Sequence, residues 1–313
     1  MAIHMKWRRG CAAWTVALAA AVAPAAAWAD TYTQTRHPVV LVHGMLGFDA
    51  IGPVDYFYGI PAALRAGGAT VYTPAVSALN SSEERGEQLL AQLRQLKAAH
   101  GHTRFNLIGH SHGGPTIRYV AAVAPELVAS VTTVGAPHTG SPVADGIEAQ
   151  AGAVGLTGVV AQVVNALGTV ISWISGSPGL PQNALATLTS LNTRGAAAFN
   201  ARFPQGAPTT PCGQGPEVVN GVRYYSVGGT GVVTNLLDPS DAFLGLTSLY
   251  FKGEANDGLV GRCSAHWGTV IRDDHAWNHL DEVNQAFGLR SVFSADPVAF
   301  YRGQANRLKQ LGL

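Results

Sequence analysis

Residues 105–123, which read FNLIGHSHGGPTIRYVAAV, place an apolar run, a glycine-rich turn and a segment of helical character in immediate succession. The run Phe105–Ile108 is typical of a buried strand, and Thr116–Val123 is typical of a helix. Two similar apolar runs occur at Val39–Val42 and Val131–Val134. Buried strands that alternate with helices favour a mostly parallel sheet covered by helices on both faces. The sequence therefore predicts an α/β fold, and a chain of 313 residues can form a single domain of this kind.

Further elements extend this pattern on both sides. Ser81 and Glu84 form a capping-box pair ahead of leucines at positions 89, 90, 93 and 96, which predicts an amphipathic helix. In the second half of the chain we predict strands at Arg223–Val227, at Ser248–Phe251 and around Val270, and helices at Asp281–Phe287 and Tyr301–Leu311.

The turn Gly109-His110-Ser111-His112-Gly113 fits the pattern G-x-S-x-G between a strand and a helix. A serine in such a turn is exposed at the carboxyl end of its strand, and the flanking glycines let strand and helix pass closely. This context indicates that Ser111 is a nucleophile. The alternative is a purely structural glycine turn.

A serine hydroxyl needs a general base, and the base needs a carboxylate that orients it. The expected chain order is serine, acid, histidine. Asp257 lies in a turn after the predicted strand Ser248–Phe251, and His279 lies in a loop after the strand around Val270. Spacing alone leaves competitors open: His266 and His275 for the base, and Asp238, Asp241, Asp273, Asp274 and Asp281 for the acid.

An acyl-transfer site also needs backbone N–H donors for the oxyanion. One is expected from the residue after the serine, His112, and one from the loop after an earlier strand. The turn His43-Gly44-Met45 follows the strand Val39–Val42, so Met45 is the second candidate. A plain turn between strand and loop is the alternative.

The composition excludes some functions and favours others. A net charge of +1 offers no basic surface for nucleic acid. Charged residues make up 12% of the chain, against about 25% in an average protein. A chain with so few charges and 47% hydrophobic residues has a large core and an unusually apolar surface.

The N-terminus has the pattern of a secretory signal. Three basic residues precede the apolar run Trp14–Ala27 and the small-residue cleavage pattern Ala27-Trp28-Ala29. We therefore expect a signal peptide over residues 1–29, a mature catalytic domain over residues 30–313 and secretion. A retained anchor is the alternative. Only Cys212 and Cys263 remain after cleavage, and two cysteines in an oxidising compartment are expected to pair rather than stay free.

A second unusual segment lies in the middle of the chain, where residues 149–193 contain no charged residue and no histidine. Polar residues at positions 162, 165, 169 and 172 fall on one stripe of a helix, and aliphatic residues occupy the rest. We interpret residues of about 145–180 as an apolar lid that opens onto lipid. A buried core helix and a membrane span are the alternatives, although glutamine, asparagine and glycine within the segment disfavour the span.

Five stretches together resemble the secreted bacterial lipases of family I, the Pseudomonas and Burkholderia type, over nearly the whole mature chain. These stretches are residues 37–44 (HPVVLVHG), 109–114 (GHSHGG), 238–245 (DPSDAFLG), 256–260 (NDGLV) and 278–285 (NHLDEVNQ). The resemblance implies an α/β-hydrolase fold with a helical lid and the triad Ser111, Asp257 and His279.

The same resemblance implies a bound ion and partners. One structural Ca²⁺ would be held by Asp238, Asp281 and the backbone carbonyls of Gln285 and Leu289, ligands of the hard oxygen type that Ca²⁺ takes. From the residues alone, an aspartate near a helix start is more often a cap. The resemblance also implies a Cys212–Cys263 disulfide, a membrane-anchored foldase and export through the periplasm.

The expected activity is hydrolysis of triacylglycerols at an oil–water interface. Two other classes stay open: a broad carboxylesterase or polyester depolymerase with the same chemistry, and a lipid-binding protein without catalysis.

Overall fold

The computed structural model describes residues 30–52, 54–153, 158, 177 and 179–313. The predicted signal peptide and most of the predicted lid lie outside these residues.

Within the described residues, seven strands form one sheet in the order β4-β1-β5-β6-β8-β7, and β9 also pairs with β8. All neighbours are parallel except β7 and β8. The strands are β1 (Val39–Val42), β4 (Val71–Tyr72), β5 (Phe105–His110), β6 (Val128–Val134), β7 (Val218–Val219), β8 (Val222–Gly229) and β9 (Thr269–His275). A separate antiparallel pair joins β2 (Ala50–Ile51) to β3 (Val54–Asp55).

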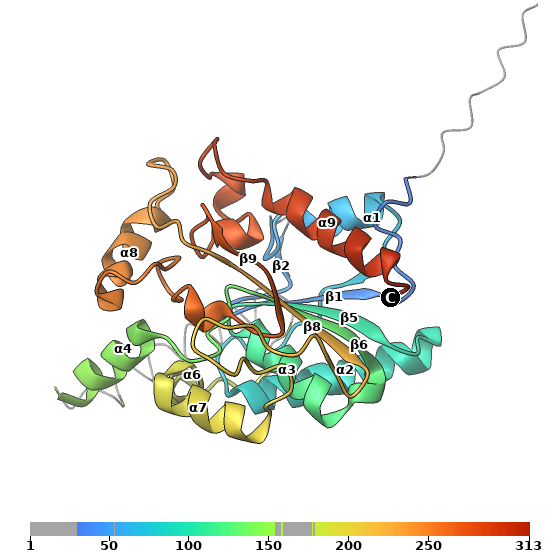
Figure 1. Ribbon diagram of the computed structural model, residues 1–313, viewed down its shortest axis with the longest axis horizontal. Coiled ribbons are helices and arrows are strands. Elements are labelled where there is room, and N and C mark those ends of the chain that lie inside the picture. The colour runs from blue at the N-terminus through green and yellow to red at the C-terminus, as the bar shows by residue number, and fades with distance from the viewer. Residues whose placement is uncertain (1–29, 53, 154–157, 159–176, 178) are drawn as a thin grey trace, which may run out of the picture.

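Helices cover both faces of the sheet (Figure 1). Two of them, α1 (Ile60–Ala66) and α9 (Pro297–Gln310), lie on one face, and α2 (Ser82–His100) and α3 (Gly113–Val123) lie on the other. The remaining helices are α4 (Pro142–Ala153), α6 (Ala184–Leu191), α7 (Thr193–Arg202) and α8 (Ser240–Thr247).

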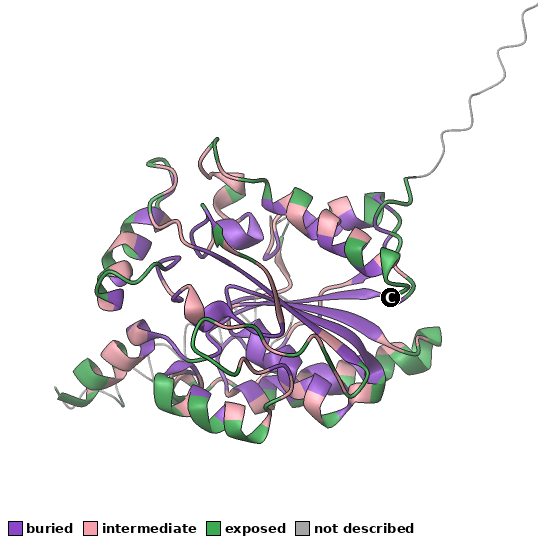
Figure 2. Cartoon of the chain, viewed as in Figure 1, coloured by how far each residue is buried: buried purple, intermediate pink, exposed green. Residues whose placement is uncertain are grey.

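The pleat of β1 shows how the core divides. Val40 and Val42 pack into the cluster under α2 and α3, whereas Val39 and Leu41 pack into the cluster under α1 and α9. Successive side chains of a strand point to opposite faces, so a strand between two helical layers must be apolar throughout. Figure 2 accordingly shows the strands buried at the centre of the molecule. The predicted α/β class is confirmed.

The helix predicted after Ser81 is also confirmed. The Ser81 hydroxyl accepts a hydrogen bond from the Glu84 N–H, and Leu89, Leu90 and Leu93 are buried.

Two predicted elements are wrong. Residues Ser248–Phe251 form a 3-10 turn, η2, that directly continues α8, and none of the strands in the described part of the chain pairs with them. The helix predicted at Asp281–Phe287 is instead two 3-10 turns, η4 (Asp281–Val283) and η5 (Ala286–Gly288). Between and within them, Asn284, Ala286 and Phe287 have positive φ, which a helix does not allow.

Cys212 and Cys263 form a disulfide. No helix in the described ranges combines the length and the apolar character needed to cross a membrane.

Candidate active site

Ser111 lies in the tight turn between β5 and α3. Its φ is 53°, in the left-handed region that non-glycine residues rarely occupy. The Ser111 N–H donates to the Val134 carbonyl at the end of β6, and the Gly114 N–H donates to the Ser111 carbonyl. These bonds hold the strained turn in place, and strain of this kind clusters at functional sites.

The turn leaves no room for a side chain at Gly109 or at Gly113. A Cβ added to Gly113 would lie 2.2 Å from the Val42 carbonyl oxygen, and one added to Gly109 would lie 2.3 Å from the Gly113 carbonyl oxygen. The contacting atoms are backbone, so they cannot move aside without shifting a strand or the helix.

We therefore expect Gly113→Ala to lower the free energy of unfolding by about 1–3 kcal/mol, the usual cost of overpacking. Gly303→Ala is the matched control, because Gly303 lies within α9 and a Cβ there meets nothing within 4 Å. The control should be neutral or stabilising by up to about 1 kcal/mol, since alanine favours helix. Denaturant unfolding of both variants measures the difference, and equal stability would contradict this account of the turn.

Asp257 and His279 are brought together by two hydrogen bonds. His279 Nδ1 lies 2.8 Å from Asp257 Oδ2, and the His279 N–H donates to the Asp257 carbonyl at 2.9 Å. The other carboxylate oxygen, Oδ1, accepts from the N–H groups of Leu259 and Val260. Both side chains are almost fully buried, so the imidazole has one fixed orientation.

The competing histidines occupy other environments. His266 pairs with Asp273 at 2.9 Å, and Arg262 also binds this carboxylate. His275 stacks on Trp277 with ring centroids 3.7 Å apart. Of the competing acids, Asp241 accepts from Asn278 and from two backbone N–H groups, and Asp274 pairs with Arg272. Two His–Asp pairs therefore form among these candidates, and of the two only Asp257–His279 is hydrogen-bonded to a residue of the Ser111 turn, through His110.

The loop after β1 reaches the turn that carries Ser111. A Cβ added to Gly44 would lie 2.7 Å from the Ser111 Cβ, so only glycine allows this approach. Among the described residues, the backbone N–H groups of Met45 and His112 donate to no protein atom. Two donors next to Ser111 are thus left for another acceptor.

Arg85 supports this loop from inside the core. Its guanidinium donates to the carbonyls of His43, Gly44 and Ser77 and to the Thr116 hydroxyl. Burial lowers the pKa of Arg85 to about 9. No local pattern in the sequence indicates the role of Arg85, because two of its acceptors are backbone oxygens more than 40 residues away in the chain.

Three further buried side chains, Tyr56, His110 and Glu282, form a connected group next to His279, and the sequence did not indicate their roles. His110 Nδ1 lies 2.7 Å from the Tyr56 hydroxyl, and His110 Nε2 lies 3.0 Å from the His279 carbonyl oxygen. Glu282 accepts from the Gly229 N–H, and its other oxygen lies 3.2 Å from His110 Nε2. Because His110 precedes Ser111 in the chain, these contacts place His279 beside the turn.

Two of the side chains near His279, Glu282 and His110, have pKa values shifted by burial. Burial, reinforced by the charge of Asp257, raises the pKa of Glu282 well above its usual range. Burial lowers the pKa of His110 well below its usual range. His110 is therefore uncharged at neutral pH, and Glu282 holds its proton more tightly than an exposed glutamate does.

Two groups of residues could hold a metal. His110, His279 and Glu282 each offer a ligand atom, and these atoms lie within 4.8 Å of one another. Two imidazoles with one carboxylate suit a transition metal rather than Ca²⁺. Separately, Asp238 Oδ2 and Asp281 Oδ1 are buried carboxylate oxygens that accept no hydrogen bond from the described residues. Burial, reinforced by the charges of Asp241 and Asp238, raises the pKa of Asp281 to about 6.

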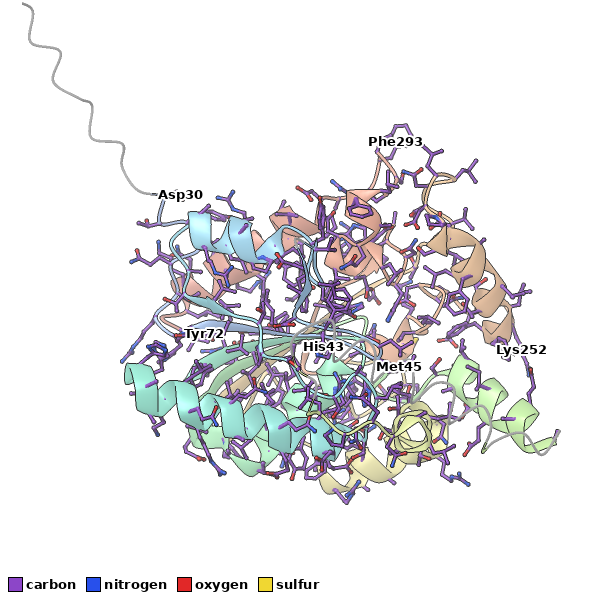
Figure 3. The ribbon with its side chains drawn as sticks, turned by 180° about the vertical axis from the view of Figure 1, so that it is seen from behind. Asp30, His43, Met45, Tyr72, Lys252 and Phe293 are labelled. Atoms are coloured by element: carbon purple, nitrogen blue, oxygen red, sulfur yellow. A yellow bond between two sulfur atoms is a disulfide. The ribbon has the colours of Figure 1, made fainter. Side chains whose placement is uncertain are left out.

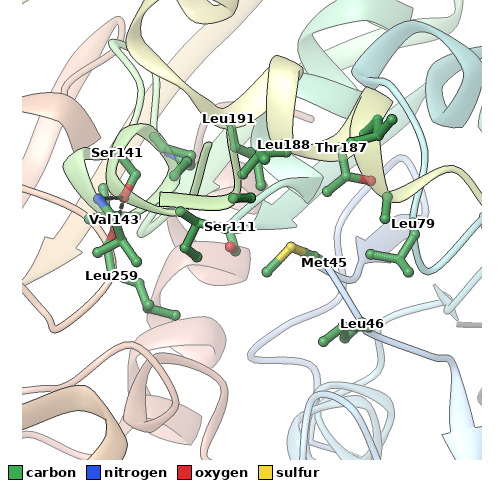
Figure 4. A pocket seen from close by; sticks show the side chains of 17 residues that line it. Met45, Leu46, Leu79, Ser111, Ser141, Val143, Thr187, Leu188, Leu191 and Leu259 are labelled. Carbon is green, nitrogen blue, oxygen red and sulfur yellow. Dashed lines mark hydrogen bonds between the residues drawn. The ribbon is translucent and has the colours of Figure 1, made fainter. Parts of the chain in front are cut away.

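Ser111 opens onto an apolar cavity of about 280 Å³ (Figure 4). Met45, Leu79, Val143, Leu188, Leu191 and Leu259 are among its walls. They come from the loop after β1, from the loop between β4 and α2, from α4, from α6 and from the loop that follows Asp257. The cavity therefore suits an aliphatic group, presented to the hydroxyl at its edge.

A serine in a strained strand-to-helix turn, a bonded Asp–His pair beside it and unpaired backbone donors define the class of serine hydrolases built on a parallel sheet. The family described as alpha/beta hydrolase fold matches residues 37–227.

Curated relatives match along most of the chain. A triacylglycerol lipase of Vibrio cholerae is 55% identical over 90% of this chain and 90% of its own. Triacylglycerol lipases of Pseudomonas fragi and Burkholderia plantarii are 46% and 44% identical over 91% and 95% of this chain, and over 100% and 92% of their own. The chain belongs to the α/β-hydrolase fold family, among its bacterial triacylglycerol lipases.

Solved structures agree on the fold. Lipase 1 from Pelosinus fermentans aligns with a TM-score of 0.59 at 18% identity, over 89% of this chain and 100% of that one. A metagenomic carboxyl esterase aligns with a TM-score of 0.60 at 18% identity, over 88% and 76%.

Proposed function

We propose that this protein is a triacylglycerol lipase that hydrolyses lipid esters at an oil–water interface. One observation carries the proposal: Ser111 lines an apolar cavity, and the buried, hydrogen-bonded Asp257–His279 pair lies next to its turn. An acyl chain would fill the cavity while its ester carbonyl meets the hydroxyl. The relatives named triacylglycerol lipase support the same substrate class.

In the proposed mechanism, Ser111 Oγ attacks the ester carbonyl carbon and His279 accepts the hydroxyl proton. Asp257 holds the imidazole by its Nδ1 and stabilises the imidazolium that forms. The N–H groups of Met45 and His112 would donate to the oxyanion. His279 then protonates the leaving alcohol, and water releases the fatty acid from Ser111 by the same steps.

A broad carboxylesterase or polyester depolymerase would use the same residues, so the test must vary the physical state of the substrate. We expect fatty acid release from a triolein emulsion, and a rate on tributyrin that rises once tributyrin exceeds its solubility limit. The apolar lid proposed for residues of about 145–180 explains such a rise, because an oil surface stabilises an open, apolar face. Efficient hydrolysis of soluble esters without release from triolein would favour the esterase.

Secretion after cleavage at residue 29, export through the periplasm and assistance by a membrane-anchored foldase belong to the same proposal. They rest on the N-terminal pattern and the family resemblance. Mass analysis of the secreted chain, and active yield with and without a foldase from a bacterial relative, test them.

We further propose that Asp238 and Asp281 hold one structural Ca²⁺, together with the carbonyls of Gln285 and Leu289. The unpaired buried oxygens of the two aspartates fit a hard divalent cation, since buried carboxylates are costly without a positive partner. A bound ion would neutralise these charges. Asp281 lies two residues from His279. Its place at the site would therefore fix the loop that carries the proposed general base.

Chelation is therefore expected to act on stability. Excess EDTA should lower the melting temperature by several degrees, because an ion that binds only the folded state stabilises it by mass action. The variant Asp281→Asn should melt lower than the parent in Ca²⁺ and should lose its response to EDTA. Calorimetry of both proteins, with and without added Ca²⁺, measures this. Identical melting of the parent in EDTA and in Ca²⁺ would contradict the site.

A further inference from the structure

One edge of the molecule carries large apolar side chains that are turned toward solvent. They lie on α8 and the η2 turn that continues it, on the loop before α8 and on the loop after η5, and each is between 56% and 95% exposed. We call this group the apolar rim: Val233, Leu236, Leu237, Phe243, Leu246, Leu249, Val292 and Phe293. Soluble proteins rarely gather so many exposed large apolar side chains, and such groups mark interaction surfaces.

The fold holds α8 with its apolar side outward. Asp241, Leu244 and Thr247 are buried, while Phe243 and Leu246, three residues apart, face solvent. The buried face of α8 is thus anchored partly by a carboxylate, and the outer face is aliphatic and aromatic. This is the reverse of an ordinary surface helix, which turns its charges to water.

Hydrogen bonds join the three parts of the rim. Asp241 Oδ2 accepts from the N–H groups of Thr234 and Asn235, which ties the first loop to α8. The Asn235 amide donates to the Arg290 carbonyl, which ties this loop to the loop of Val292 and Phe293. The rim is therefore one connected surface, and Figures 1 and 3 show α8 and both loops along one edge of the molecule, with Phe293 at its outer limit.

The rim borders the substrate cavity. A Cβ added to Gly258 would lie 2.8 Å from the Leu244 Cβ, so α8 packs on the loop whose Leu259 lines the cavity. Tyr250 of η2 packs against Gly146 of α4, and its hydroxyl accepts from Gln150. Since α4 forms another wall of the cavity, α8 and η2 pack directly against two of the cavity walls.

The chemistry of the rim fits a lipid surface. Residues 229–237, 242–251 and 291–295 contain no charged residue. At the base of the last loop, Arg290 pairs with Asp296 at 3.4 Å. A protein partner needs matched hydrogen bonds and close shape complementarity, whereas a fluid apolar phase accepts separate aliphatic and aromatic side chains on projecting loops.

We propose that the apolar rim is a fixed docking surface for the lipid–water interface, which holds the cavity mouth against the oil in addition to any movement of the lid. This inference rests on the proposed lipase function. It assigns lipid adsorption to residues that take no part in the chemistry.

Adsorption is measured separately from catalysis. Parent and variants carry Ser111→Ala, so that the droplets stay intact, and they are mixed with triolein droplets coated with phosphatidylcholine. The rim variants are Phe243→Ser with Leu246→Ser, and Val292→Ser with Phe293→Ser. The matched control is Val218→Ser with Val123→Ser, two exposed apolar side chains on β7 and α3, away from the rim. We expect each rim variant to bind droplets at least tenfold more weakly, and the control to stay within twofold.

The same substitutions with Ser111 intact show whether the site is unharmed. We expect kcat/KM for a short ester below its solubility limit to stay within twofold of the parent, while triolein hydrolysis falls in parallel with adsorption. Droplet binding equal to the parent in both rim variants would overturn the proposal and leave the lipase function standing. If the parent binds droplets through the rim but does not hydrolyse triolein, the proposed lipase function is wrong and the docking surface is supported. If the parent is a dimer that the rim substitutions dissociate, and if adsorption does not change, then a second copy of the chain covers the rim. That result would also overturn the proposal.

Discussion

Replacing Ser111 by alanine is expected to lower kcat for ester hydrolysis by about 10⁴- to 10⁶-fold. Loss of the nucleophile from a serine–histidine–aspartate triad has an effect of this size, and the remaining rate comes from substrate binding and oxyanion donors. Here the Asp257–His279 pair, the cavity and the N–H groups of Met45 and His112 all remain. The measurement is hydrolysis of tributyrin and of triolein emulsion by the purified parent and variant.

Folding must be shown to be unchanged. Alanine keeps the Cβ of Ser111 and the same φ of 53°, so the melting temperature should match that of the parent. A fluorophosphonate should label the parent once, at Ser111, and should not label the variant. A variant that keeps more than a hundredth of the parent rate, or labelling at another serine, would remove Ser111 from the mechanism.

The second large effect is expected at His279. Replacing it by glutamine removes the base, and in triads this loss nearly equals the loss of the nucleophile because the two act as a unit. We therefore expect kcat to fall by about 10⁴-fold or more. For the same reason, Ser111→Ala with His279→Gln should be hardly slower than Ser111→Ala alone.

The chain offers a close control for this substitution. His266 is also a buried histidine bonded to an aspartate, with Nε2 2.9 Å from Asp273 Oδ2. His266→Gln should cost stability similar to that lost by His279→Gln but leave kcat within a few-fold of the parent. Activity and melting temperature are measured for both. A comparable loss of activity in the two variants would mean that the effect at His279 is one of folding.

Several features could be predicted from the sequence because they depend on neighbours in the chain. The run Phe105–Ile108, the turn around Ser111 and the helix after it are local patterns, and each forms where it was predicted. The capping pair of Ser81 and Glu84 is local as well. The alternation of these elements was enough to predict a parallel sheet covered on both sides.

Other features could not be predicted because they depend on distant contacts. Ser248–Phe251 has the composition of a strand, yet it forms a 3-10 turn, since a strand requires a partner that the fold does not provide there. Spacing could not separate Asp257 from five other aspartates. The roles of Tyr56, His110 and Glu282 follow from buried contacts across more than fifty residues, and nothing in their local sequence indicates these contacts.

By itself, the sequence determined where the turn of Ser111 lies and what kind of sheet supports it, because apolar runs and glycine turns depend on only a few neighbouring residues. Only the tertiary structure decided which aspartate bonds to His279, since spacing left five others open, and which carboxylates are left unpaired in the described interior. Packing also turned the apolar side of α8 outward, although the apolar residues within 240–247 are equally typical of a helix that buries this side. The physical reason is the same in each case: a hydrogen bond or a buried contact depends on positions in space, and the fold brings distant parts of the chain to those positions.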